Sequence, residues 1–106
     1  MATFVKVATV HDVPPGERLL VEFEEETVAI FNVDGRYYCI ADVCTHDGGP
    51  VAEGELDGYE IICPRHGARF DVRTGDALSM PAVVPVASYQ VRVEGEDILV
   101  ESPDEC

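Results

Sequence analysis

Short apolar runs with the spacing of β-strands alternate with turn residues along most of the chain. The runs are rich in Val, Ile, Tyr and Phe, which are favoured in strands, and the breaks between them carry Gly, Pro and Asp, which are favoured in turns. No long stretch has apolar residues at positions i, i+3, i+4 and i+7, the spacing of an amphipathic helix. The expected strands are Thr3–Ala8, Arg18–Glu24, Thr27–Val33, Arg36–Ala41, Tyr59–Cys63, Ser88–Val93 and Ile98–Glu101. The pattern therefore predicts an all-β fold of small antiparallel sheets, arranged as a sandwich or barrel.

One pair of these strands has a clear hairpin signal between its members. Asp34-Gly35 separates Thr27–Val33 from Arg36–Ala41, and a two-residue Asp-Gly turn favours antiparallel pairing because both residues tolerate a positive φ. Two other segments, Asp42–Pro50 and Pro64–Phe70, lack the strand alternation and contain Gly and Pro. We expect both to be loops carried by the β scaffold, where functional residues are often found.

The size and charge of the chain narrow the range of functions. Its 106 residues suffice for one domain, which we expect to span residues 1–106. Seven basic against 21 acidic residues give a formal net charge of −14 at pH 7, which disfavours nucleic acid and anionic membranes as partners because phosphate binding relies on clustered Lys and Arg. No apolar run is long enough to span a membrane and no secretory signal is recognised, so we expect a cytoplasmic protein.

The two loops bring a matched pair of Cys and His motifs. One reads Cys44-Thr45-His46 and the other Cys63-Pro64-Arg65-His66. Thiolate and imidazole are the ligands that soft and borderline metals prefer. Structural zinc sites usually pair Cys with Cys and His with His, whereas each arm here is mixed, which suits a binuclear site. Zinc in the same four ligands, and a disulfide beside two unrelated histidines, are the alternatives.

The two motifs and their surroundings, Cys-Thr-His-Asp-Gly-Gly-Pro and Cys-Pro-Arg-His-Gly-Ala-Arg-Phe-Asp, closely resemble those of the Rieske [2Fe–2S] family. The resemblance implies one [2Fe–2S] cluster, with Cys44 and Cys63 on one iron and His46 and His66 on the other. Histidine in place of two cysteines raises the reduction potential above that of plant-type ferredoxins. The resemblance also implies that residues 74–78 and 80–82 form a third loop beside the cluster.

The chain departs from the Rieske proteins of respiratory and photosynthetic complexes. Gly49 and Arg65 stand where those proteins have a disulfide, and Ala68 and Phe70 where they place a Ser and a Tyr hydroxyl near the cluster. Fewer donors to the sulfurs stabilise the reduced form less, so we expect a potential near the low end of the Rieske range of about −150 to +300 mV. These departures make the chain most similar to the ferredoxin components of multicomponent aromatic-ring dioxygenases.

That resemblance implies a one-electron carrier with no substrate-turnover site of its own, in which the cofactor supplies the chemistry. Its expected partners are a flavin-containing reductase, as electron donor, and a terminal oxygenase, as acceptor. Two other functions are alternatives. One is the small Rieske-like subunit of an assimilatory nitrite reductase, and the other is a zinc-stabilised binding module with no redox role.

Three of the seven basic residues, Arg65, Arg69 and Arg73, lie around the second motif. One interpretation is that they neutralise acidic residues across the loops, namely Asp47, Asp71 and Asp76. The other is that Arg65 orients a docking partner, since charges at an interface mainly affect association rate and specificity.

The remaining candidate residues have structural interpretations. Cys39 lies in a strand and is expected to be a buried thiol, and His11 is expected to be an exposed loop residue. The tyrosines Tyr37, Tyr38, Tyr59 and Tyr89 are expected to pack on strand faces. The candidates for an apolar collar around the cluster are Val43, Pro50, Pro64 and Pro81.

Overall fold

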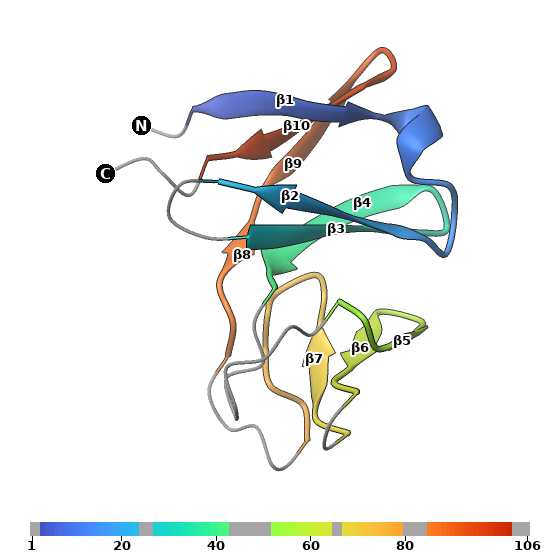
Figure 1. The fold of residues 1–106 in the computed structure, drawn as a ribbon, viewed down its shortest axis with the longest axis vertical. Helices are drawn as coiled ribbons and strands as arrows, with labels where there is room; N and C mark the ends of the chain where they lie inside the picture. Colours follow the sequence, from blue (N-terminus) through green and yellow to red (C-terminus); the bar gives the residue numbers. More distant parts are fainter. Residues whose placement is uncertain (1–2, 24–26, 43–51, 65–66, 80–84, 103–106) are drawn as a thin grey trace.

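The computed structural model describes residues 3–23, 27–42, 52–64, 67–79 and 85–102 (Figure 1). Within these ranges the chain forms ten β-strands and one short 3-10 helix, and no α-helix. The strands make three antiparallel sheets, which follow one another along the longest axis of the molecule (Figure 1). The expected all-β fold of small antiparallel sheets is confirmed.

We name the three sheets A, B and C in that order along the long axis. Sheet A has the strand order β1 (Phe4–Thr9), β10 (Asp97–Glu101), β9 (Val91–Glu94). Sheet B has the order β2 (Arg18–Glu22), β3 (Thr27–Val33), β4 (Arg36–Ala41), β8 (Ser88–Tyr89). Sheet C has the order β5 (Glu55–Asp57), β6 (Glu60–Ile62), β7 (Arg69–Asp71).

Strand β3 lies between two buried clusters, one on each of its faces. Ile30 packs in a cluster with Ile98 of sheet A, whereas Phe31 packs in a second cluster with Ile61 and Phe70 of sheet C. Successive side chains of a strand point to opposite faces, so a strand that is covered on both faces has an almost continuous apolar sequence. Sheet B is therefore the middle layer on which the other two sheets are assembled.

The β3–β4 hairpin forms where the sequence predicts it, and both strands have the expected bounds. Asp34 and Gly35 have φ values of 53° and 88°, as a two-residue hairpin turn requires. The buried Asn32 supports the turn, because its Oδ1 accepts a hydrogen bond from the Gly35 N–H at 2.8 Å. Its amide nitrogen donates to the Val13 carbonyl at 2.7 Å, which ties the turn to the chain between β1 and β2.

One expected strand, Ser88–Val93, is wrong because the chain changes sheets within it. β8 pairs with β4 in sheet B, and β9 pairs with β10 in sheet A. Gln90 lies at the bend, where its carbonyl accepts the Glu101 N–H at 3.0 Å. Strands that cross between packed sheets bend at such corners. The alternation of apolar and polar residues continues through the bend, so the sequence pattern does not show where the strand divides.

Sheet C contains two strands that the sequence pattern does not reveal. β7 occupies the end of a segment expected to be loop, Pro64–Phe70, and continues to Asp71, while β5 was not expected at all. Each has a single apolar residue between two charged ones, and this residue is paired with Ile61 of β6. Such short segments become strands only because β6 provides a partner, so the expectation of a loop was wrong there.

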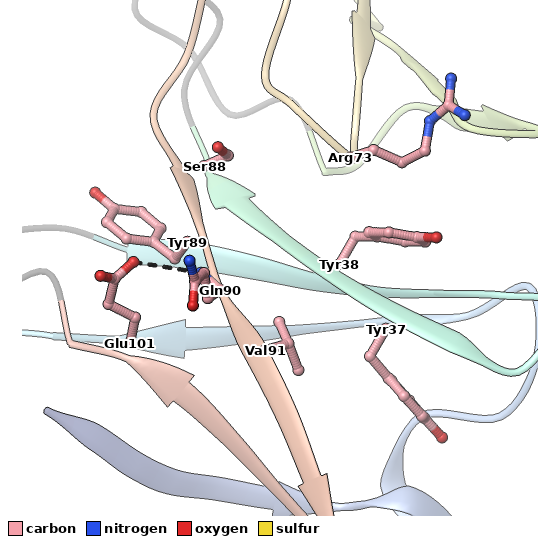
Figure 2. Close-up of a pocket in the computed structure, with 8 residues that line it drawn as sticks. All are labelled: Tyr37, Tyr38, Arg73, Ser88, Tyr89, Gln90, Val91 and Glu101. Carbon is pink, nitrogen blue, oxygen red and sulfur yellow. Dashed lines mark hydrogen bonds between the residues drawn. The ribbon is translucent and has the colours of Figure 1, made fainter. Parts of the chain in front are cut away.

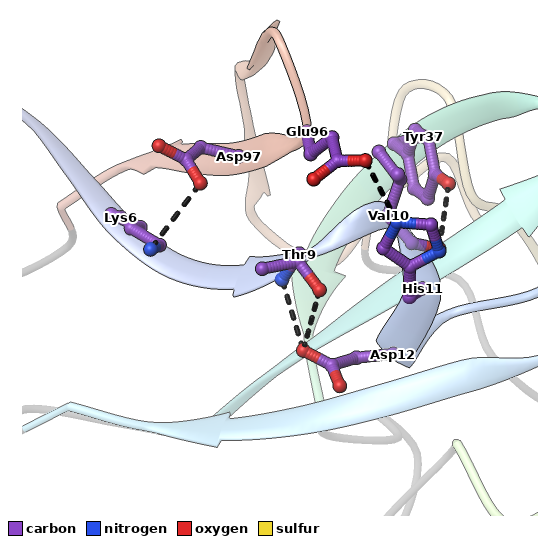
Figure 3. Close-up of polar contacts among 8 residues, drawn as sticks. All are labelled: Lys6, Thr9, Val10, His11, Asp12, Tyr37, Glu96 and Asp97. Atoms are coloured by element: carbon purple, nitrogen blue, oxygen red, sulfur yellow. Dashed lines mark hydrogen bonds and ion pairs between the residues drawn. The ribbon is translucent and has the colours of Figure 1, made fainter.

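The edge of sheet A next to β1 is held by polar contacts (Figure 3). The 3-10 helix η1 (Val10–Asp12) follows β1, and Asp12 Oδ2 accepts hydrogen bonds from the Thr9 N–H at 2.9 Å and hydroxyl at 3.2 Å. His11 is exposed, as expected, but lies in this helix with its Nε2 3.0 Å from Glu96 Oε1. These contacts connect η1 to the β9–β10 turn, far from sheet C.

Candidate metal centre

The structure describes one of the four expected ligands. Cys63 directly follows β6 and is 1% exposed. Cys44, His46 and His66 lie outside the described residues, as does Arg65. Among the residues that are described, no group of three or more His, Cys, Asp or Glu side chains could hold a metal ion. The structure therefore describes the surroundings of Cys63 and the two residues that flank the first motif in the sequence, Asp42 and Ala52.

Cys63 is positioned by the β6–β7 hairpin. Its N–H donates to the Ala68 carbonyl at 2.7 Å, and its own carbonyl accepts the Gly67 N–H at 3.0 Å. These bonds extend the strand pairing of Ile62 with Arg69 by one step. The second Cys-His motif consequently connects β6 to β7 in the sequence. The backbone hydrogen bonds between these strands fix the position of the Cys63 backbone.

The surroundings of the Cys63 thiol are apolar. Ala68 and Phe70 are fully buried and belong to the same cluster as Cys63. Cys63 is not in a disulfide. Pro64, an expected member of the collar, is exposed, and the other three collar candidates lie outside the described residues. A buried thiol with apolar neighbours is a soft donor that is kept away from water, which fits the sulfur-ligated iron of an iron–sulfur cluster.

The segment expected to form a third loop lies beside the second ligand hairpin. The Leu78 N–H donates to the Arg69 carbonyl at 2.7 Å, and the Arg69 N–H donates to Ser79 Oγ at 3.1 Å. Ala77 also forms a β-bridge with Phe70. Residues 76–79 therefore extend along β7, which supports the position implied for this loop, while residues 80–82 lie outside the described residues.

The two described arginines of this region are paired with carboxylates. Arg73 donates from Nη2 to Asp71 Oδ2 at 2.9 Å and stacks over the Tyr59 ring at 4.1 Å from its centroid. The hydrogen bond from Arg73 lowers the pKa of the Asp71 carboxyl below its usual range, against the opposite effect of burial. Arg69 lies 3.4 Å from Asp57 Oδ2 and 3.2 Å from Glu60 Oε1. The neutralising interpretation is confirmed for Arg73 and Asp71. The described partners of Arg69 are Asp57 and Glu60, which were not among the expected partners, while Asp47 lies outside the described residues.

The structural interpretations of the other candidates hold. Cys39 is 1% exposed, is not in a disulfide, and lies in the cluster between sheets A and B. The four tyrosines pack against the two buried clusters, and the rings of Tyr38 and Tyr59 meet edge to face at 5.8 Å. The Tyr38–Tyr59 contact joins sheet B to the β5–β6 turn of sheet C.

A cavity of about 470 Å³ lies at the corner where β8 leads into β9 (Figure 2). It is lined by Tyr37 and Tyr38 of β4, by residues 88–91, and by Arg73 and Glu101. The described residues of its lining carry no thiol or imidazole group.

Two residues that the sequence did not single out, Arg18 and Asp42, hold the end of the first motif's loop. Asp42 Oδ1 accepts the Ala52 N–H at 2.8 Å, and Arg18 Nη1 donates to the Ala52 carbonyl at 2.6 Å. Arg18 Nη1 also donates to the Gly54 carbonyl. In the sequence, Arg18 is recognisable as a charged residue at the start of an apolar strand, but this position does not reveal that the carbonyls of Ala52 and Gly54 are its hydrogen-bond acceptors.

Comparison with known proteins gives the class. Residues 3–90 match the Rieske [2Fe–2S] domain. The chain is 45% identical over 100 residues to the biphenyl dioxygenase ferredoxin subunit of Pseudomonas sp. (strain KKS102), covering 93% of this chain and 92% of the relative. The ferredoxin of carbazole 1,9a-dioxygenase from Nocardioides aromaticivorans IC177 has a TM-score of 0.88 at 36% identity, covering 93% of this chain and 97% of that one. A chain in a complex of reduced oxygenase and oxidized ferredoxin of carbazole 1,9a-dioxygenase has a TM-score of 0.89 at 33% identity, covering 97% and 96%.

The chain belongs to the Rieske [2Fe–2S] family, and its cofactor is one Rieske-type [2Fe–2S] cluster. Within that family it is a ferredoxin, an electron-transfer component rather than a catalytic enzyme. The zinc-stabilised module is thereby set aside, and the relatives favour the ferredoxin over the nitrite reductase subunit. No helix in the described ranges is long and apolar enough to cross a membrane.

Proposed function

We propose that this ferredoxin carries single electrons from a flavin-containing reductase to the terminal oxygenase of an aromatic-ring dioxygenase system in the cytoplasm. The relatives that support this are named as ferredoxin subunits of biphenyl and of 3-phenylpropionate/cinnamic acid dioxygenases. A similar ferredoxin occurs in a complex with its oxygenase. The net charge of −14 supports steering toward basic surfaces on these partners.

The cluster ligands in this proposal are Cys44, His46, Cys63 and His66. The single observation that carries the assignment is Cys63, a buried thiol outside any disulfide, held at the loop of the β6–β7 hairpin among apolar side chains. When bound, the cluster takes up and releases one electron. The chain's own contribution is to fix the thiol and exclude water. Ala68 and Phe70, which are buried beside Cys63, carry no hydroxyl, which supports a potential near the low end of the Rieske range.

We also propose that residues 1–106 make a single domain. The family match ends at residue 90, but β9 and β10 follow it and complete sheet A by pairing with β1. Ile98 and Val100 of β10 are fully buried against sheet B. The segment after residue 90 therefore packs on one face of sheet B, while the cluster that contains Cys63 packs on the other.

The ligand assignment is tested with two buried cysteines that are both 1% exposed, Cys63 and Cys39. The wild-type protein should contain two iron atoms and two labile sulfides and give a Rieske-type EPR signal when reduced. Cys63→Ala should abolish iron binding and the signal, because the thiolate ligand is lost, whereas Cys39→Ala should keep both. Colourless wild-type protein after anaerobic reconstitution, or a normal cluster in Cys63→Ala, would overturn the assignment.

The electron-carrier role is tested by leaving out components. The purified ferredoxin, a flavin-containing ferredoxin reductase and a ring-hydroxylating oxygenase are combined with NADH and an aromatic substrate. Hydroxylated product should form only when all three proteins are present. Product formed at the same rate without the ferredoxin would contradict the role.

A further inference from the structure

We propose that Arg18 is a positioning residue for the cluster, which acts by holding the segment 52–54 between the two ligand loops. This inference rests on the ligand set proposed above. Arg18 is the first residue of β2 in sheet B, and no strand of that sheet contains a proposed ligand. Its side chain nevertheless reaches the segment that leads from the first ligand loop into sheet C.

The contacts of Arg18 place it at the exit of the first ligand loop. Its Nη1 donates to the Ala52 carbonyl at 2.6 Å and also to the Gly54 carbonyl. The N–H of Ala52 donates to Asp42 Oδ1 at 2.8 Å. Asp42 immediately follows β4, so both backbone groups of Ala52 are bound by side chains from sheet B or directly next to it. The hydrogen bond from the Ala52 N–H to Asp42 Oδ1 therefore holds together the two residues that flank the first motif in the sequence.

The same segment also touches the second ligand loop. Gly54 lies so close to β6 that an added Cβ would be 1.6 Å from the Ile62 carbonyl oxygen and 3.3 Å from Pro64 Cδ. Ile62 and Pro64 are the neighbours of Cys63. Ala52 belongs to the buried cluster that contains Cys63. Residues 52–54 thus contact Asp42, which precedes the first motif, and the residues on either side of Cys63. Arg18 binds the same segment from sheet B.

The guanidinium group of Arg18 is itself held in place. Its Cζ lies 5.9 Å from the centroid of the Phe31 ring in β3, and Phe31 is fully buried. A planar guanidinium against an aromatic ring keeps a fixed direction of its N–H donors, which a flexible ammonium does not. Groups that orient metal ligands from outside typically change metal affinity by about 10- to 100-fold when they are removed.

The test compares Arg18→Gln with Arg92→Gln. Arg92 provides the matched control because it also stacks on an aromatic ring, with its Cζ 4.2 Å from the Phe4 centroid, but lies in β9 of sheet A. Iron loss to a chelator should be about tenfold faster in Arg18→Gln and within about twofold of wild type in Arg92→Gln. The reduced Arg18→Gln protein should also give a broadened EPR signal, because the ligand geometry is less uniform.

Three outcomes would overturn the proposal. The first is a wild-type rate of iron loss in Arg18→Gln. The second is equally fast iron loss in Arg92→Gln, which would indicate net charge as the cause. The third is faster iron loss in Arg18→Gln with an unaltered EPR signal, which would indicate general destabilisation. Should Arg18→Gln fail to fold, Arg18→Lys carries the test. Iron loss faster than in Arg92→Gln then supports the proposal and an equal rate overturns it.

Amide hydrogen exchange tests the contact between Arg18 and residues 52–54 independently of the ligand assignment. A peptide spanning residues 52–64 should exchange faster in Arg18→Gln than in wild type, and this readout needs no cluster. A wild-type protein without iron would overturn the ligand set, while unchanged exchange in this peptide would overturn the proposed role of Arg18. The two failures are therefore distinguishable.

Discussion

The sandwich of sheets A and B and the smaller sheet C are built on different physical principles. Sheet B uses strands of five to seven residues in its first three members, and fully buried Val28, Ile30, Ile98 and Val100 fill the space to sheet A. Sheet C has three strands of three residues each, with ion pairs at Arg69 and Arg73. Burial of apolar area is the main stabilising contribution in small folds. The buried residues Ile61 and Phe70 of sheet C pack against Phe31 of sheet B, so we expect sheet C to depend on that neighbour and on its cofactor more than the sandwich does.

Cys63, the proposed ligand that the structure describes, lies next to β6 of sheet C. Sheet C is attached to sheet B through the cluster of Phe31, Ile61 and Phe70, through the Tyr38–Tyr59 contact and through Arg18. Anything that binds the native state but not the unfolded one adds to its stability. A ligand site on the less stable element therefore receives its rigidity partly from the cofactor itself.

The largest effect should follow removal of the cluster. After iron and sulfide are stripped with a chelator under reducing conditions, amides in residues 55–71 should exchange at least about tenfold faster, because three-residue strands that have lost a bound cofactor open locally. Amides in residues 28–40 should keep their protection, because both faces of β3 are covered. Hydrogen exchange with peptide-level mass spectrometry measures both, and equal deprotection of the two regions would remove the distinction between them.

The next effect should come from a matched pair of cavities. Ile30 and Ile61 are both fully buried, so Ile30→Ala and Ile61→Ala should each lower the free energy of unfolding by about 2–5 kcal/mol in urea titrations. Only Ile61→Ala should also speed iron loss to a chelator, since Ile61 lies in the cluster that contains Cys63. Similar iron-loss rates in the two variants would show that the cofactor senses overall stability and not sheet C.

The smallest effect should come from the charge pairs. Asp71 is 12% exposed and paired with Arg73 at 2.9 Å, whereas the Lys6–Asp97 pair of sheet A has side chains 57% and 47% exposed. Asp71→Asn should lower the free energy of unfolding by about 1 kcal/mol, and Lys6→Met should change it by less than about 0.5 kcal/mol. Urea unfolding of freshly diluted protein at pH 7 measures both.

The contribution of Asp71 should depend on pH in one direction. Its pKa is lowered below the ordinary value of 3.8, so its stabilising effect is fully present above that value and is lost as the pH falls through the lower, folded-state pKa. The difference between wild type and Asp71→Asn should be the same at pH 7 and pH 5 and should narrow below pH 4. A difference that grows on acidification would contradict the pairing with Arg73.

The sequence alone predicts the features that are local or compositional. The Asp34-Gly35 turn specifies the β3–β4 hairpin because its two residues accept positive φ, and the mostly apolar segment Thr27–Val33 predicts a strand. The spacing of Cys44, His46, Cys63 and His66 points to an asymmetric metal centre, since thiolate and imidazole donors in mixed pairs have few other uses. The family follows from these motifs.

Only the tertiary structure decides which distant groups meet. β5 and β7 are strands because β6 lies between them, Ser88–Val93 divides because β4 and β10 lie in different sheets, and Arg69 pairs with Asp57 and Glu60 across sheet C. Arg18 reaches the carbonyls of Ala52 and Gly54 for the same reason. Backbone carbonyls occur at every residue, so the sequence cannot mark which of them accepts a long side chain; the packing of sheet C against sheet B makes that choice.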